Sequence, residues 1–310
     1  MRLARKALLA LSTHRGLTTW ATHSKVVRRS VTRFMPGERL DDALGAAREL
    51  RARRMGVIVT ELGENLTTPD DARAVAARYA AAIERIASEG LDAYVSIKPT
   101  QLGLDLDRTL CEALVVQLAD LAAASGRSLW IDMESSRYVD DTLALVTAVR
   151  QRALPVGVAI QAYLYRSAAD VDTLAPAGVS IRLVKGAYLE PPSVAMPRKR
   201  DVDDNYFGLT TRLLTSAART GGPTIHLATH DRLLIERLEA FIRTERIPDS
   251  VYEYAMLYGI QTSLQQRLAA EGRRVRVLIS YGANWFPWYM RRLAERPANV
   301  WFVARNLVGG

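Results

Sequence analysis

Cysteine is nearly absent from this sequence, since Cys111 is the single one among 310 residues. A chain with one cysteine forms no internal disulfide, which disfavours a disulfide-rich secreted protein and is typical of a reducing cytoplasm. We expect Cys111 to be a small buried residue of a helix. Long hydrophobic runs are missing as well, and none approaches the roughly 18–20 apolar residues of a membrane-spanning helix. A cytoplasmic protein is therefore expected.

Acidic residues are missing from residues 1–37, while the whole chain has a net charge of +9 and an isoelectric point near 9.8. The basic residues of this segment are Arg2, Arg5, Lys6, Arg15, Lys25, Arg28, Arg29 and Arg33. Such a segment suits a transit peptide, a signal peptide, a nucleic-acid-binding patch or a membrane-surface element. A secretory signal is disfavoured, because the apolar run ALLAL is short and is followed by His14 and Arg15. We expect a basic helical arm over residues 1–55, either as a solvated face or in peripheral contact with anionic lipid.

A G-x-G-x-x-G motif is also missing, although short apolar runs alternate with helical patterns from residue 56 onward. The eight runs that each precede a helical pattern are 56–62, 93–98, 128–133, 157–163, 180–185, 223–229, 252–257 and 275–280. Such alternation predicts a parallel sheet covered by helices, and eight units are the number that closes a (βα)₈ TIM-type barrel. The competing open, doubly wound sheet usually has fewer strands and a glycine-rich first turn. A barrel over residues 56–310 is therefore favoured.

Polar residues stand at or near the carboxyl ends of six of these predicted strands. They are Glu61, Lys98, Asp132, Gln161, Lys185 and the pair Thr229–His230. In a barrel the carboxyl ends of the strands converge on one face, where active sites are built. The pattern therefore predicts a site at this face, whereas ordinary solvation of strand ends is the simpler alternative.

The segment RLVKGAY, residues 182–188, places two cations in and directly after an apolar strand. Burying Arg182 and Lys185 costs several kcal/mol unless each of them meets an anion. Strand alternation puts Arg182 and Val184 on the same side. If that side faces the lumen, the guanidinium points at a bound ligand, and if it faces the helices, it belongs to a structural ion pair.

Two adjacent arginines, Arg291 and Arg292, lie near the start of the last predicted helix, with Glu295 within same-face reach of both. Neighbouring guanidinium groups at the rim of a barrel suit the bidentate capture of a small carboxylate. A solvated basic helix face is the alternative interpretation of the pair.

Taken in order, the strings SIKPTQLG, IDMES, IQAYLYRS, RLVKGAY, ATHD, EYAMLYGI and RRLAERP resemble the proline dehydrogenase family over most of the chain. The resemblance implies a distorted (βα)₈ barrel that holds FAD. It also implies oxidation of L-proline to Δ1-pyrroline-5-carboxylate, with hydride transfer to flavin N5 and electrons passed to a quinone.

The resemblance further implies roles for individual residues, with Asp132 and Arg182 as the catalytic pair and no metal. The residues expected to bind the flavin are Asp132, Met133, Gln161, Arg182, Val184, Lys185, Gly186, Ala187, Thr229 and His230. The residues expected to bind substrate are Lys98, Arg291, Arg292, Leu257, Glu64, Leu278 and Trp288. Glu64 is expected to pair with Arg291 across the mouth and to act as a gate over the substrate.

Two positions depart from the family pattern. Leu278 and Trp288 stand where many members of the family carry tyrosines. The resemblance implies that both lie around the substrate ring, so hydroxyproline or another cyclic imino acid is the alternative substrate. A nucleic-acid-binding protein is disfavoured, because the sequence has no basic stripe interleaved with aromatic residues and no helix-turn-helix pattern. A barrel without catalytic activity is a third hypothesis.

Overall fold

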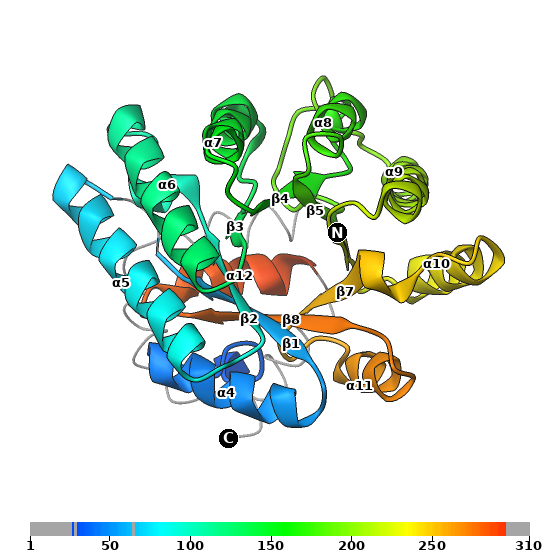
Figure 1. The fold of residues 1–310 in the computed structure, drawn as a ribbon, viewed down its shortest axis with the longest axis horizontal. Helices are drawn as coiled ribbons and strands as arrows, with labels where there is room; N and C mark the ends of the chain where they lie inside the picture. The colour runs from blue at the N-terminus through cyan, green and yellow to red at the C-terminus, as the bar shows by residue number, and fades with distance from the viewer. Residues whose placement is uncertain (1–26, 28–29, 64–65, 296–310) are drawn as a thin grey trace.

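The computed structural model describes residues 27, 30–63 and 66–295, and the side chains as far as residue 290. Within this part of the chain, parallel strands pair in sequence order and the last strand pairs with the first, which closes a barrel (Figure 1). The strands are β1 (Gly56–Glu61), β2 (Ala93–Ile97), β3 (Leu129–Ile131), β4 (Val156–Gln161), β5 (Ser180–Val184), β6 (Ile225–Ala228), β7 (Tyr252–Leu257) and β8 (Val275–Tyr281). The predicted (βα)₈ barrel is confirmed.

All of the helices except the last surround the barrel in Figure 1. The helices are α4 (Leu40–Ala52), α5 (Pro69–Ser88), α6 (Arg108–Ala124), α7 (Val139–Gln151), α8 (Ser167–Leu174), α9 (Lys199–Thr220), α10 (Arg232–Thr244), α11 (Thr262–Ala270) and α12 (Trp285–Glu295). Short 3₁₀ turns occur at Pro99–Leu102, Ser136–Tyr138 and Asp249–Val251. Cys111 lies buried in α6, as expected, and burial raises the pKa of its thiol to about 12.

Helix α9 begins at Lys199, whereas its first buried residue is Tyr206. Its first turns are charged and mostly exposed, so they show no apolar periodicity. They are joined instead by pairs four residues apart, Lys199 with Asp203 and Arg200 with Asp204. Such pairs stabilise a helix by about 0.2–0.5 kcal/mol each, which explains why the apolar pattern alone places the start of the helix too late.

Two stacked rings identify the side chains that face the lumen. Trp130 belongs to β3 and His226 to β6, yet their ring centroids lie only 4.1 Å apart at an interplanar angle of 21°. These strands are not neighbours, so the rings meet inside the barrel. Arg182 is the register partner of His226 on the adjacent strand β5 and therefore shares this face. The alternative in which Arg182 faces the covering helices is excluded.

Charged groups fill the floor of the lumen, near the amino ends of the strands. Arg276 donates to the carboxylate of Glu253 and, at 3.0 Å, to Asp92, and its guanidinium carbon lies 4.1 Å from the ring centroid of Tyr94. The Nε2 atom of His226 is 3.3 Å from Glu253. Burial alone would raise the pKa of Glu253, but contact with His226 and Arg276 lowers it, so the carboxylate stays ionised. Breaking such a buried pair typically costs about 3–5 kcal/mol.

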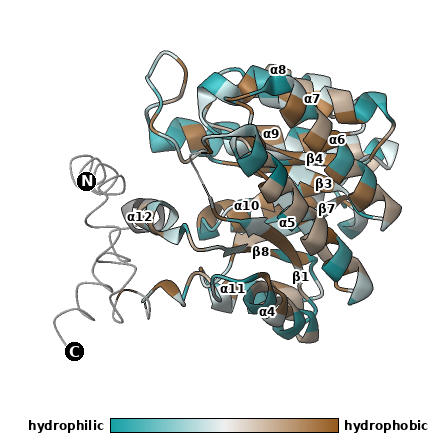
Figure 2. Cartoon of the chain, turned by 90° about the vertical axis from the view of Figure 1, so that its left-hand side faces the viewer, coloured by the Kyte–Doolittle hydropathy of each residue, from teal (hydrophilic) through white to brown (hydrophobic). Residues whose placement is uncertain are grey.

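Helix α12 lies over one end of the barrel. It falls within the ring of strands in Figure 1 and outside them in the perpendicular view of Figure 2. Its buried side chains pack with the segment before α4 in a second, smaller apolar cluster, which consists of Val27, Val31, Phe34, Met35, Leu62, Trp285, Phe286, Tyr289 and Met290. Ser30 and Tyr289 share a hydrogen bond of 2.6 Å, and Trp285 donates to Glu38 at 3.1 Å. The segment before α4 therefore positions α12.

Helix α4 packs against β1 and β8 and contributes Leu44 and Leu50 to the main core. The predicted arm over residues 1–55 thus contains, in its described part, one helix that covers the barrel. The division of the chain after residue 55 stays a prediction. Among the described residues, no helix is long and apolar enough to cross a bilayer.

The buried state of His226 predicts a pH dependence of stability. Burial lowers the pKa of this imidazole from 6.5 to about 4, and the cations of Arg276 and Arg182 act in the same direction, against the opposing Glu253. The unfolded state therefore binds the additional proton as the pH falls through 6.5, which destabilises the fold. Between about pH 7.5 and about pH 5.5 this group should remove about 1.4 kcal/mol of unfolding free energy.

Urea titrations of the wild type and of His226→Phe at the two pH values measure this contribution. The variant keeps a ring on Trp130 but does not titrate, so it should lose less stability on acidification by about that amount. Equal losses in both proteins would contradict a neutral, buried His226.

Candidate active site

The carboxyl ends of the strands bring together most of the predicted site residues. Lys98, Asp132 and Lys185 directly follow β2, β3 and β5, and Thr229 directly follows β6. Leu257 and Leu278 are register partners on β7 and β8. The expected place at the carboxyl end of a strand is therefore confirmed for Lys98, Asp132, Lys185 and Thr229. Lys98 and Asp132 lie together on the face that Arg182 shares, whereas Lys185 is turned toward Asp203 of the covering helix α9. The roles of these residues in a site stay predictions.

Glu61 behaves differently from the other strand-end residues. Its carboxylate accepts a hydrogen bond of 2.7 Å from Nε of Arg78 on the covering helix α5. Glu61 lies on the same face of β1 as Val57 and Val59, which belong to the outer core. Ile58 and Thr60 lie on the opposite face of this strand. The expectation that Glu61 contributes to the mouth is wrong, because strand alternation turns it toward the helices.

Asp132 is the anion that Arg182 meets. Its Oδ1 atom accepts hydrogen bonds from Arg182 and, at 2.8 Å, from the hydroxyl of Ser96, while Oδ2 lies 3.8 Å from the ammonium of Lys98. Arg182 is 3% exposed and also donates to the Ser96 hydroxyl at 3.1 Å. A buried guanidinium is tolerated here because a carboxylate and a hydroxyl compensate it.

Ser96 was not identified from the sequence, although a signal was available. It stands two positions before Lys98 on the same strand, so alternation points both side chains to the same face. A single serine in the apolar run AYVSIK resembles an ordinary strand residue. Its importance follows from its contacts, because its hydroxyl joins Asp132 to Arg182.

Gln161 binds the backbone of the segment that follows β3. Its Nε2 atom donates to the carbonyl oxygens of Met133 and Glu134, at 3.3 and 3.1 Å. The Glu134 carboxylate in turn accepts from the amide and the hydroxyl of Thr100, at 3.0 and 2.7 Å. Burial raises the pKa of Glu134, and the hydrogen bonds from Thr100 oppose that shift. These contacts hold the backbone on which Asp132 is mounted.

Lys185 already has protein anions as partners. Its ammonium donates to Asp203 at 2.5 Å and to Asp231 at 2.8 Å, and Lys199 binds the same two carboxylates. Burial would raise the pKa of Asp231, but hydrogen bonds from Lys185 and Lys199 lower it. Two lysines thus face two carboxylates. Neither aspartate was identified from the sequence as a partner of Lys185.

The turn after β5 depends on a residue without a side chain. Gly186 has a φ of 113°, and a Cβ atom there would lie 2.2 Å from the ring of Tyr163. The turn carries half-buried Val184 and exposed Ala187 beside the mouth. The backbone of Tyr163 also binds the loop between β5 and α9, because its carbonyl oxygen accepts a hydrogen bond of 2.8 Å from the amide of Met196.

His230 links the ends of β6 and β7. Its Nε2 atom accepts a hydrogen bond of 2.9 Å from the amide of Leu257. This contact requires that Nε2 carries no proton, so a neutral His230 has its proton on Nδ1. The two predicted site residues are therefore in direct contact.

Four of the expected substrate residues need separate comment. Trp288 is half-buried in α12 and packs beside the second apolar cluster. Arg291 and Arg292 belong to the same helix, but their side chains lie outside the described residues. Glu64 lies outside the described residues altogether, so its pairing with Arg291 stays a prediction.

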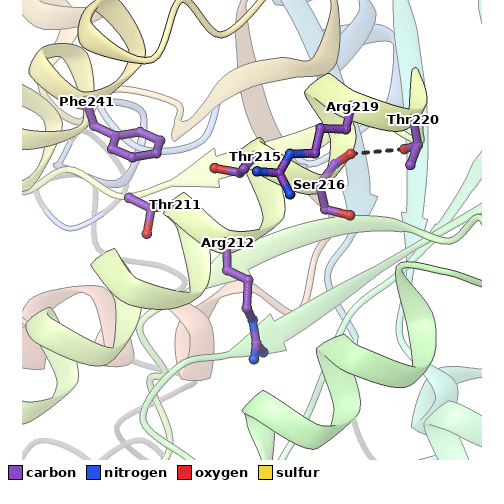
Figure 3. A pocket seen from close by; sticks show the side chains of 7 residues that line it. All are labelled: Thr211, Arg212, Thr215, Ser216, Arg219, Thr220 and Phe241. Carbon is purple, nitrogen blue, oxygen red and sulfur yellow. Dashed lines mark hydrogen bonds between the residues drawn. The ribbon is translucent and has the colours of Figure 1, made fainter.

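A hollow elsewhere on the molecule is not this site. Figure 3 shows a cavity of about 430 Å³ along α9, which faces Phe241 of α10. Several of its polar groups are already bound: the Thr211 and Thr220 hydroxyls donate to backbone oxygens of their own helix, and Arg212 contacts Asp172. None of the residues predicted for the mouth lines this cavity.

The chemistry of the mouth fits a flavin. Nη1 of Arg182 and Oε1 of Gln161 are buried and have no hydrogen-bond partner within the described part of the chain. The edge of a flavin ring offers carbonyl and nitrogen acceptors as well as an N–H donor, and therefore has a partner for the unpaired donor of Arg182 and for the unpaired acceptor of Gln161. Groups of His, Cys, Asp and Glu that could hold a metal ion are absent from the described residues.

Comparisons with known proteins show the family of the chain. A family model described as "Proline dehydrogenase" matches residues 43–305. The chain is 35% identical over 306 residues to "Proline dehydrogenase 1" of Bacillus subtilis subsp. natto, with 99% of both chains covered. It is 36% identical over 287 residues to "Proline dehydrogenase" of Deinococcus radiodurans, with 90% of both covered.

Among solved structures, proline utilization A (PutA) from Bdellovibrio bacteriovorus superimposes with a TM-score of 0.80 at 22% identity. The match covers 87% of this chain and 33% of that one, so the chain spans about a third of that larger protein. At this identity the likeness shows the fold alone. The family model and the curated relatives show more: the chain belongs to the proline dehydrogenase family.

Proposed function

We propose that the protein is a proline dehydrogenase that uses FAD to oxidise L-proline to Δ1-pyrroline-5-carboxylate, the first step of proline catabolism. The observation that carries this proposal is the Asp132 carboxylate, held between Lys98 and Arg182 at the mouth of a barrel from this family. The alternative substrate is hydroxyproline or another cyclic imino acid. It is favoured by Leu278 and Trp288, which stand at positions expected to surround the substrate ring.

FAD, when bound, supplies the acceptor for the hydride that leaves the ring carbon next to the proline nitrogen. In the proposal, the residues that hold it are Asp132, Met133, Gln161, Arg182, Val184, Lys185, Gly186, Ala187, Thr229 and His230. Arg182 places a positive charge where negative charge develops on a flavin ring. Asp132 keeps both Arg182 and Lys98 in place.

The proposed substrate clamp consists of Lys98, Arg291 and Arg292, which bind the carboxylate of proline. Leu257 provides an apolar wall for the ring, and Glu64 closes the site from the loop after β1. A bound carboxylate faced by several cations in a water-poor site gains strength from charge-assisted hydrogen bonds. This clamp selects amino acids over simple amines.

We further propose that a quinone receives the electrons and that the protein acts in the cytoplasm with peripheral contact to the membrane. The basic residues before position 37 support this contact, because each lysine or arginine near an anionic lipid surface contributes about 1 kcal/mol. Residues 1–26 lie outside the described residues, so this contact rests on their charge alone.

The first test of the proposed function is anaerobic flavin reduction. Purified holoprotein should lose its oxidised-flavin absorbance on addition of L-proline, and retain it with pyrrolidine, which has the ring but no carboxylate. Hydroxyproline in parallel distinguishes the alternative substrate. A flavin that stays oxidised with all cyclic imino acids would overturn the proposal.

The clamp gives a second test. Arg291→Ala and Arg292→Ala should each raise the KM for proline by about tenfold or more, because losing a charge-assisted partner of a desolvated carboxylate costs about 1.5–3 kcal/mol. Flavin content should not change. Arg243→Ala, which removes an exposed arginine of α10, is the matched control. Unchanged proline kinetics in both clamp variants would place the arginine pair on a solvated face.

Ser96→Ala tests the hub around Asp132. The variant removes one hydroxyl between two buried charged groups, so kcat/KM should fall by about ten- to a hundredfold. Thr210→Val removes a hydroxyl of equal burial from α9 and should leave kcat/KM unchanged. If Ser96→Ala and Thr210→Val have the same kinetics, Ser96 has no part in the site.

A further inference from the structure

One lumen residue between the charged floor and the mouth has no role in the proposed function so far. Trp130 is 1% exposed, and the guanidinium carbon of Arg182 lies over its ring at 5.4 Å from the centroid. His226 stacks on the same indole at 4.1 Å. The indole is thus in contact with a ring of the floor and with a cation of the mouth.

The position of this indole depends on small residues of the next strand. Gly157 is the register partner of Trp130 on β4, and a Cβ atom there would lie 2.5 Å from atoms of the indole. Ala159, two residues further along β4, is the register partner of Arg182. These small side chains leave the part of the lumen that the indole and the guanidinium fill.

Hydrogen bonds alone do not determine where Arg182 lies. Only its Nη2 atom donates to Asp132 and Ser96, whereas Nη1 has no partner among the described residues. A guanidinium held at one nitrogen can tilt about that nitrogen. A flat aromatic face against the guanidinium restricts such tilting and attracts the cation, by an amount that grows when the site is desolvated.

We propose that Trp130 is a positioning residue for Arg182, and that its indole sets how far the guanidinium reaches into the mouth. The indole stacks on His226, and the missing side chain of Gly157 leaves the space that it occupies. This inference rests on the proposed function in that Arg182 is taken to lie beside the flavin. Trp130 itself touches neither substrate nor flavin in this account. It acts through the position of the Arg182 charge.

The consequence is a change in the electrochemistry and binding of the flavin. A cation close to the ring favours the reduced, more negative flavin, so a displaced Arg182 should shift the midpoint potential to more negative values. A weakened contact should also raise the Kd of FAD for the apoprotein, by about three- to thirtyfold if one cation–π contact is lost. A residue that only fills space would lower the melting temperature without moving the potential.

The experiment compares four variants by dye-mediated reductive titration and by FAD titration of the apoprotein, neither of which needs proline. Trp130→Leu removes the aromatic face, and Gly157→Ala pushes against it; both should give a more negative potential and weaker FAD binding. Trp130→Phe keeps a smaller ring and should be intermediate. Gly45→Ala in α4, where an added Cβ meets nothing within 4 Å, is the control and should match the wild type.

Folded Trp130→Leu and Gly157→Ala proteins with the wild-type potential and FAD affinity would overturn the inference. If both fail to fold, Trp130→Phe decides: an intermediate shift supports the role, and a wild-type potential overturns it. A separate result would overturn the proposed function, namely a wild-type flavin that is not reduced by proline or its analogues. The two outcomes are therefore distinguishable.

Discussion

The carboxylate of Asp132 is the anion that makes a buried arginine inside the barrel tolerable. An uncompensated guanidinium in a lumen walled by indole and aliphatic side chains would cost several kcal/mol and would draw in water. Asp132 binds the guanidinium and the Ser96 hydroxyl, and the ammonium of Lys98 lies nearby. These contacts compensate the buried charge of Arg182 and fix its position. The contacts of Gln161 and Glu134 support the backbone beneath Asp132, so the order of the mouth depends on this one carboxylate.

The lumen contains two separate ionic centres, one at each end. At the floor, Arg276 and Glu253 neutralise each other and leave His226 uncharged. At the mouth, the cations of Arg182 and Lys98 lie beside Asp132. The floor thus seals the barrel with paired charge, whereas the charged groups of the mouth lie at the carboxyl ends of the strands. Stacked rings separate the two centres, which limits how far one can compensate the other.

Much of this arrangement could be predicted from the sequence, because it depends on local periodicity. The alternation of strands and helices indicated the barrel, and polar residues at strand ends indicated the mouth at Lys98, Asp132 and Gln161. Glu61 was misplaced because position near the end of a strand was given more weight than alternation. Ser96, Asp203 and Asp231 were missed because their importance comes from partners on other strands and helices. Motif resemblance supplied the expected roles of residues such as Met133 and Leu257, which no periodicity could indicate.

Contacts between remote parts of the chain carry no local signature, and the docking of α12 on Val27 and residues 30–38 is the plainest example. Neither the apolar pattern of Val31 and Phe34 nor that of Trp285 and Tyr289 identifies the other as its partner. The early segment shows only a basic character in the sequence. Its packing role is visible only when both ends of the chain are placed together.

That docking has a consequence for the order of folding. Ser30 and Tyr289 are 259 positions apart, so their hydrogen bond closes almost the whole chain into a loop. Contacts of such long separation form late, because the chain must first lose the entropy of closure. During synthesis the amino-terminal segment emerges first, and its apolar side chains lack their packing partners until α12 has been made. The pairing of β1 with β8 joins positions almost as distant, such as Gly56 and Arg276, so closure of the lumen and docking of the helix that carries Arg291 and Arg292 both belong to the last steps of folding.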